Sequence, residues 1–72
     1  MDEKELLERL AKRITQIRQK KGLTKEKMAF GGGSAKSNVT KIESGNRDMR
    51  VSTLFKIAEG LGVKLKDLVD FY

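Results

Sequence analysis

The chain has 72 residues, carries a formal net charge of +6, and contains no histidine, cysteine, proline or tryptophan. So short a chain supports one domain with a modest core, which leaves no room for a deep catalytic cleft. Because the commonest general base and metal ligand is missing, and thiolates with it, we expect no enzyme, no cofactor and no metal centre.

The first predicted helix begins near Asp2, which resembles a capping box together with Glu5 three residues later. Lys20 and Lys21 suit the negative end of the helix dipole, and Gly22 is a natural stop. Apolar residues at helical spacing predict the face that enters the core. They are Leu6, Leu7, Leu10, Ile14 and Ile17.

A second, short helix is predicted over about residues 25–31, with Thr24 as its N-cap. Three consecutive glycines, residues 31–33, come next. Each glycine in a helix interior costs roughly 1 kcal/mol relative to alanine, so we expect the triplet to fray the end of this helix. Gly33 is the one that we expect at the left-handed position of the following turn. The letters GGGS also resemble an engineered linker.

The third predicted helix covers about residues 35–44 and ends at Gly45. At about 100° per residue its side chains divide into two faces. One face is apolar and consists of Ala35, Val39 and Ile42, with Glu43 beside them. The opposite face is polar and consists of Ser37, Thr40, Lys41 and Ser44, flanked by Lys36 and Asn38.

A polar loop, NRDMR, leads to a fourth helix that opens at Val51 or Ser52 and ends at Gly62. Its apolar stripe consists of Leu54, Ile57, Ala58 and Leu61. The apolar residues of a short fifth helix are Val63, Leu65, Leu68, Val69, Phe71 and Tyr72. Since no segment alternates in the way of a strand, the pattern predicts an all-α bundle.

Positive charge is concentrated in the middle of the chain. From Arg9 to Arg50 there are 12 basic residues and three acidic ones. This imbalance indicates a polyanionic partner, with a solvated cationic surface as the alternative. No apolar run approaches the roughly 20 residues of a membrane span, and the acidic beginning MDEKELLERL lacks a signal-peptide stretch. We therefore expect no membrane partner and a cytoplasmic location.

The segment FGGGSAKS superficially resembles the phosphate-binding P-loop pattern G-x-x-x-x-G-K-[ST]. Phe30 and Ala35 stand at the two positions where that pattern requires glycine, and no strand precedes the segment. A nucleotide site is therefore not expected.

In the order and spacing of its residues the chain resembles the phage repressor and Cro type (XRE family) of helix-turn-helix domains. The resemblance covers about residues 10–70, and the run LFKIAEGLGVKLKDL is very close to the family's fourth and fifth helices. The other matching residues are Arg13-Ile14 through Arg18, Gly22-Leu23-Thr24, Met28-Ala29, Gly33, Val39, Ile42-Glu43 and Gly45. The resemblance implies a compact, lambda-repressor-like five-helix domain spanning residues 1–72, whose second and third helices form the helix-turn-helix.

The resemblance also implies a function: a sequence-specific regulator of transcription, a repressor, that binds double-stranded DNA as a homodimer and takes no small-molecule ligand. Its third helix is expected to read bases in the major groove. Positions that match base contacts are Lys36, Ser37 and Lys41, with Asn38 and Thr40 next to them. Positions that match phosphate contacts are Thr24, Lys25, Asn46, Arg47 and Arg50. Arg18 and Glu43 match a pair that forms a buried salt bridge in related domains.

The chain departs from the family around the turn. Related domains carry helix-forming residues where Gly31 and Gly32 stand, an apolar residue at Ser34 and a Ser or Thr cap at Ala35. The spacing across the turn still matches without insertion or deletion. We expect the turn to be mobile in the free protein and to become ordered on DNA.

A protein-interaction or antitoxin-type module on the same fold, with little or no DNA binding of its own, is the alternative function. Apolar residues of the fifth helix that stay exposed would mark a partner surface in that case.

Overall fold

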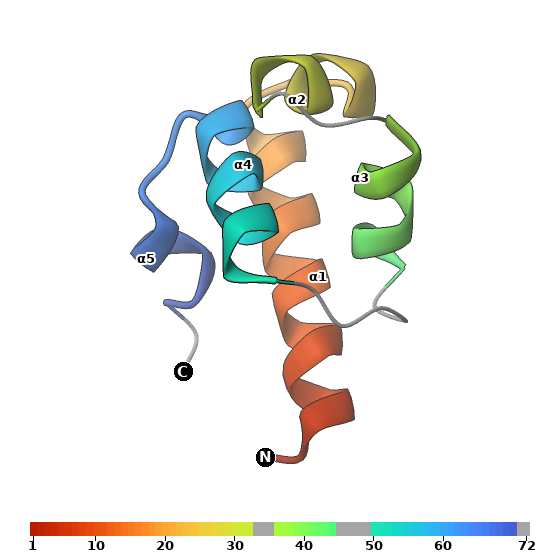
Figure 1. The fold of residues 1–72 in the computed structure, drawn as a ribbon, viewed down its shortest axis with the longest axis vertical. Helices are drawn as coiled ribbons and strands as arrows, with labels where there is room; N and C mark the ends of the chain where they lie inside the picture. Colours follow the sequence, from red (N-terminus) through yellow and green to blue (C-terminus); the bar gives the residue numbers. More distant parts are fainter. Residues whose placement is uncertain (33–35, 45–49, 71–72) are drawn as a thin grey trace.

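The computed structural model describes residues 1–32, 36–44 and 50–70 of the chain. It contains five helices: α1 (Glu3–Lys20), α2 (Lys25–Gly32), α3 (Lys36–Glu43), α4 (Val51–Leu61) and α5 (Leu65–Leu68). In Figure 1, α1 is the long vertical helix, α2 lies across its C-terminal end, and α3 and α5 lie on opposite sides of the bundle. The radius of gyration is 10.9 Å, close to the roughly 11 Å of a folded chain of this length. The predicted all-α, five-helix fold is confirmed.

Local capping interactions and glycine conformations explain where these helices begin and end. The Asp2 carboxylate accepts a hydrogen bond from the Glu5 backbone N–H at 2.8 Å and caps α1. The Thr24 hydroxyl accepts one from the Lys27 N–H at 3.1 Å and caps α2. Gly22, after α1, and Gly62, after α4, adopt φ angles of 69° and 71°. Only glycine takes these left-handed angles without strain, so both helices stop where the sequence predicted.

The glycine triplet does not fray α2 before Gly32, so the predicted end of this helix was one residue too early. The reason is a tertiary contact that propensity ignores. A Cβ atom placed on Gly31 would lie 3.4 Å from the Cα of Gly60 in α4. Glycine at both positions lets the two helix backbones approach closely, and this packing outweighs glycine's low helix propensity. Gly33 and the expected mobility of the turn lie outside the described residues.

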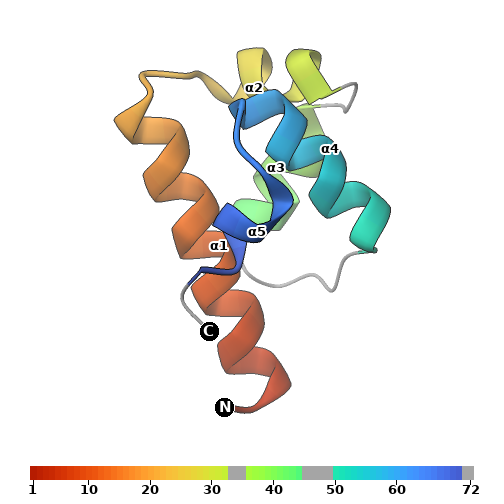
Figure 2. The same cartoon turned by 90° about the vertical axis from the view of Figure 1, so that its left-hand side faces the viewer.

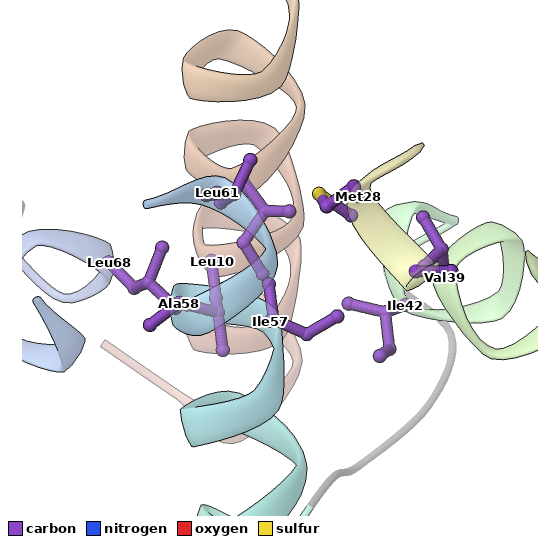
Figure 3. Packing of buried hydrophobic residues seen from close by; sticks show 10 residues of the cluster. Leu10, Met28, Val39, Ile42, Ile57, Ala58, Leu61 and Leu68 are labelled. Carbon is purple, nitrogen blue, oxygen red and sulfur yellow. The ribbon is translucent and has the colours of Figure 1, made fainter. Parts of the chain in front are cut away.

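One apolar core joins all five helices. Its largest fully buried side chains are Ile14, Met28, Val39, Ile42, Ile57, Leu61 and Leu68. Figure 3 shows the side chain of Ile42, from α3, directed toward Ile57 of α4, with Val39 beside it and Met28 above. Both apolar residues of α3 in the described part of the chain are thus buried in the core, whereas Thr40 and Lys41 are exposed.

Val69 does not join the core, although it belongs to the apolar series predicted for the fifth helix. Its residue surface is 42% exposed, whereas Leu68 beside it is fully buried. Helix α5 ends at Leu68, so Val69 no longer follows the helical repeat that would direct it inward.

Candidate nucleic-acid interface

Helix α3 lies at one edge of the bundle, on the right-hand side of Figure 1. Val39 and Ile42 are buried, whereas Thr40 and Lys41 between them are exposed. A hydroxyl and an ammonium group therefore point away from the core on a helix whose inner side is fixed by packing. Lys36, Ser37 and Asn38 belong to the first turn of α3, but their side chains lie outside what the structure describes.

The last residue of α3, Glu43, is held by α1. Nε of Arg18 donates to Oε2 of Glu43 at 2.8 Å, and Nη2 donates to Oε1 at 3.2 Å. The Thr15 hydroxyl donates to the same Oε1 at 2.9 Å. The side chains of Arg18 and Glu43 are only 13% and 7% exposed. Both carboxylate oxygens are therefore satisfied by a forked, charge-assisted contact inside the protein.

Arg18 also fixes the connection between α1 and α2, because its Nη1 donates to the backbone carbonyl of Leu23 at 2.9 Å. We call Thr15, Arg18, Glu43 and the Leu23 carbonyl the Glu43 clamp. The clamp joins α1, the start of the α1–α2 connection and the end of α3. Together with the buried apolar side chains it sets the direction in which the polar side of α3 faces.

The charged pair was predicted from the sequence, but Thr15 and the Leu23 carbonyl were not. Thr15 precedes Arg18 by three residues, so the two side chains share one face of α1. That spacing is a signal that could have identified the hydroxyl as a third partner of the carboxylate. The contact with the Leu23 carbonyl depends on the path of the chain after α1, which no residue pattern specifies.

The candidate phosphate contacts are spread over three segments. Thr24 is exposed at the start of α2, and its hydroxyl hydrogen can still donate because the oxygen serves as the N-cap acceptor. Lys25 follows in the first turn, where the helix dipole also favours an anion. Arg50 is exposed immediately before α4, and its side chain makes no capping hydrogen bond. Asn46 and Arg47 lie outside the described residues.

A second group of cations lines a hollow of about 280 Å³ on α1, formed by Arg9, Lys12, Arg13 and Gln16. Arg9 pairs with Glu5 at 3.0 Å, and Nε of Arg13 donates to the Asp67 carbonyl oxygen at 3.0 Å. Two of the three cations already serve contacts within the protein, one of them tying α1 to the end of α5. Within the described segments, no cluster of acidic side chains could hold a metal ion, and no helix is long and apolar enough to cross a membrane.

A family model described as helix-turn-helix matches residues 14–68, which include all of α2, α3 and α4. The chain belongs to the helix-turn-helix family. It is a DNA-binding regulator of transcription, and its family is one of regulators rather than enzymes.

Relatives of this helix-turn-helix protein include controllers of restriction and modification. It is 37% identical over 60 residues to the control protein C.BamHI of Bacillus amyloliquefaciens, across 82% of this chain and 74% of that protein. The crystal structure of the restriction-modification controller protein C.AhdI from Aeromonas hydrophila matches with a TM-score of 0.81 and 31% identity, covering 86% of this chain and 94% of that one. The controller C.Esp1396I, solved as a tetramer with its natural 35 base-pair operator, matches with a TM-score of 0.85 and 27% identity, covering 92% and 87%.

Proposed function

We propose that this helix-turn-helix protein is a sequence-specific repressor of the controller-protein type, which places α3 in the major groove of operator DNA. The observation that carries the proposal is the division of α3 into a buried side, Val39 and Ile42, and an exposed side, Thr40 and Lys41. The Glu43 clamp fixes the exposed side relative to the rest of the bundle. The operator complex of C.Esp1396I supports the same use of the fold, and the names of the relatives extend the role to restriction–modification genes.

Within this proposal the two sets of side chains have different tasks. Lysine donates to guanine O6 and N7, asparagine pairs with adenine, and hydroxyl groups contact either kind of base. The readers are Lys36, Ser37, Asn38, Thr40 and Lys41. Phosphate contacts set register and affinity without reading sequence. They are assigned to Thr24, Lys25, Asn46, Arg47 and Arg50.

A homodimer completes the proposal. Two-fold helix-turn-helix proteins place their reading helices on half-sites about 34 Å, or one DNA turn, apart. C.Esp1396I binds its operator as a tetramer, which supports the proposal that more than one copy of this chain binds one stretch of DNA.

Replacing Lys41 with alanine is expected to relax base preference at one operator position, by roughly 1–3 kcal/mol if lysine contacts guanine there. Lys41 is exposed, so its removal leaves the core unchanged. The operator is first selected from a random duplex library. Fluorescence anisotropy then measures the affinity of wild type and variant for the selected duplex, for its single-base variants and for a random duplex.

Arg50→Ala is the matched control for this experiment. Arg50 is also exposed, and it makes no side-chain cap, so the substitution removes one cation without disturbing α4. The substitution should lower the affinity for the selected duplex and for a random duplex by similar factors, as expected when a phosphate contact is lost. If Lys41→Ala behaves in the same way, Lys41 contacts phosphate and does not read a base. If wild type binds no duplex at all, the interaction-module alternative is correct.

A further inference from the structure

The hollow on α1 is lined by four side chains of a single helix. Arg9, Lys12, Arg13 and Gln16 stand at positions i, i+3, i+4 and i+7, which are neighbours on a helix surface. Where two helices pack together, four residues of one helix form the hole that receives a side chain of the other. The hollow, about 280 Å³ in volume, therefore has the form of a site for one side chain of a facing helix.

No helix in the described part of the chain fills this hollow. Arg9, Lys12 and Gln16 are exposed, and the buried residues of α1 lie on the opposite side of the helix. The residues of α1 that hydrogen-bond to α3, Thr15 and Arg18, are not among those that line the hollow. Figure 2 shows α1 on the left of the bundle, with α4 on the right. A partner at the hollow therefore leaves the exposed side of α3 accessible.

The rim of the hollow is cationic. From Arg9 to Lys21 the chain carries six basic residues and no acidic one. Lys12 forms no ion pair with an acidic residue of the described segments. Arg13 donates from Nε to the neutral backbone carbonyl of Asp67, so this contact leaves its positive charge uncompensated. A side chain that enters the hollow should therefore be an anion.

Glu5 indicates which anion suits this rim. Its Oε1 accepts a hydrogen bond from Nη2 of Arg9 at 3.0 Å, and the two side chains are 46% and 52% exposed. Because pairs as exposed as this one contribute little, an incoming carboxylate can share or replace Glu5 at Arg9 with a small loss. A DNA duplex fits less well, since its phosphates form long rows whereas the hollow receives one group.

We propose that this side of α1 binds an acidic helix of a second protein, one glutamate of which enters the hollow between Arg9, Lys12, Arg13 and Gln16. The amide of Gln16 can donate to that carboxylate beside the charge-assisted contacts of the three cations. The chain then holds an acidic protein and DNA on different sides at the same time. This surface is separate from the proposed reading helix, and its use does not depend on DNA binding.

Fluorescence anisotropy with a labelled peptide tests the proposal without DNA. The probe is an alanine-based helical peptide with glutamate at every fourth position, and the comparison peptide has glutamine at the same positions. At about 50 mM salt, where screening is weak, the full chain should bind the glutamate peptide at least about tenfold more tightly than the glutamine peptide. Equal affinities for the two peptides would overturn the proposal.

Lys12→Glu should weaken binding of the glutamate peptide at least about tenfold, because it places like charges at the contact. Lys56→Glu is the matched control, since it makes the same change in net charge at an exposed position of α4 and should reduce the affinity far less. Equal effects of the two substitutions would mean that the peptide responds only to net charge, and the site on α1 would be rejected. Circular dichroism checks that both variants melt as folded proteins.

Chemical-shift mapping locates the bound peptide. The resonances of residues 9–16 should change on addition of the glutamate peptide, whereas those of Thr40 and Lys41 should not. An equimolar amount of random duplex should leave the peptide bound. Displacement of the peptide by the duplex would assign the hollow to phosphates, and changes at residues 9–16 when the protein alone is concentrated would assign it to a second copy. Either result would overturn the proposal.

Discussion

Replacing Glu43 with alanine is expected to lower the free energy of unfolding by roughly 3–5 kcal/mol, because the largely buried Arg18 guanidinium loses the carboxylate that pairs with it. Arg18 is 13% exposed and makes its ion pair with this carboxylate. The Thr15 hydroxyl loses its acceptor in the same substitution. A single core of this size supplies little more than roughly 3–5 kcal/mol in total, so much of the variant should be unfolded at room temperature. Urea titration followed by circular dichroism measures the effect.

The same chain provides a matched control for that substitution. Glu5 and Arg9 form an ion pair of similar length, 3.0 Å, but their side chains are 46% and 52% exposed. Glu5→Ala should change the free energy of unfolding by about 0.5 kcal/mol or less, since exposed pairs contribute little. Equal effects of the two substitutions would contradict the structural role assigned to the Glu43 clamp. Combining Arg18→Met with Glu43→Leu should recover most of the loss, because neither charge then remains buried alone.

Salt is expected to weaken operator binding about 10³-fold between 50 and 200 mM if each of two copies neutralises three phosphates. The cations that the proposal places on phosphates are Lys25, Arg47 and Arg50. Six such contacts per dimer give a slope of about −5 for the logarithm of affinity against the logarithm of salt concentration. Anisotropy titrations at several salt concentrations measure this slope.

Arg50→Ala should make that slope less steep by about two, one contact for each copy of a dimer. Gln19→Ala, at an exposed and uncharged position of α1, should leave it unchanged. A wild-type affinity that hardly responds to salt would mean that phosphate neutralisation is not what holds this protein on DNA.

Local chemistry made most of the fold predictable from the sequence. Asp2 and Thr24 signal the starts of α1 and α2 because their side chains satisfy backbone N–H groups there. Gly22 and Gly62 signal the ends of α1 and α4 because left-handed backbone angles favour glycine. Each of these signals acts within four residues, so no knowledge of the tertiary structure is needed to use it.

Predictions failed where distant segments decide the outcome. The end of α2 depends on the close approach of Gly31 to Gly60, two residues far apart in the chain. The exposure of Val69 depends on where α5 stops, and one turn of helix carries too little periodicity to define a face. Among the candidate site residues, helical spacing placed Val39, Ile42 and Glu43 toward the bundle and Thr40 and Lys41 away from it, as the structure has them. The hydrogen bond from Arg18 to the Leu23 carbonyl could not be predicted from the sequence, because it depends on the path of the chain after α1.

Chemical-shift mapping of the isotopically labelled protein, titrated with its selected operator duplex, tests the role of α3 most directly. The resonances of residues 36–41 should change more than those of any other helix, with Thr40 and Lys41 differing between selected and random duplexes. Undisturbed resonances across residues 36–41, in a complex that other methods show to be fully formed, would contradict the assignment of α3 as the DNA-reading helix.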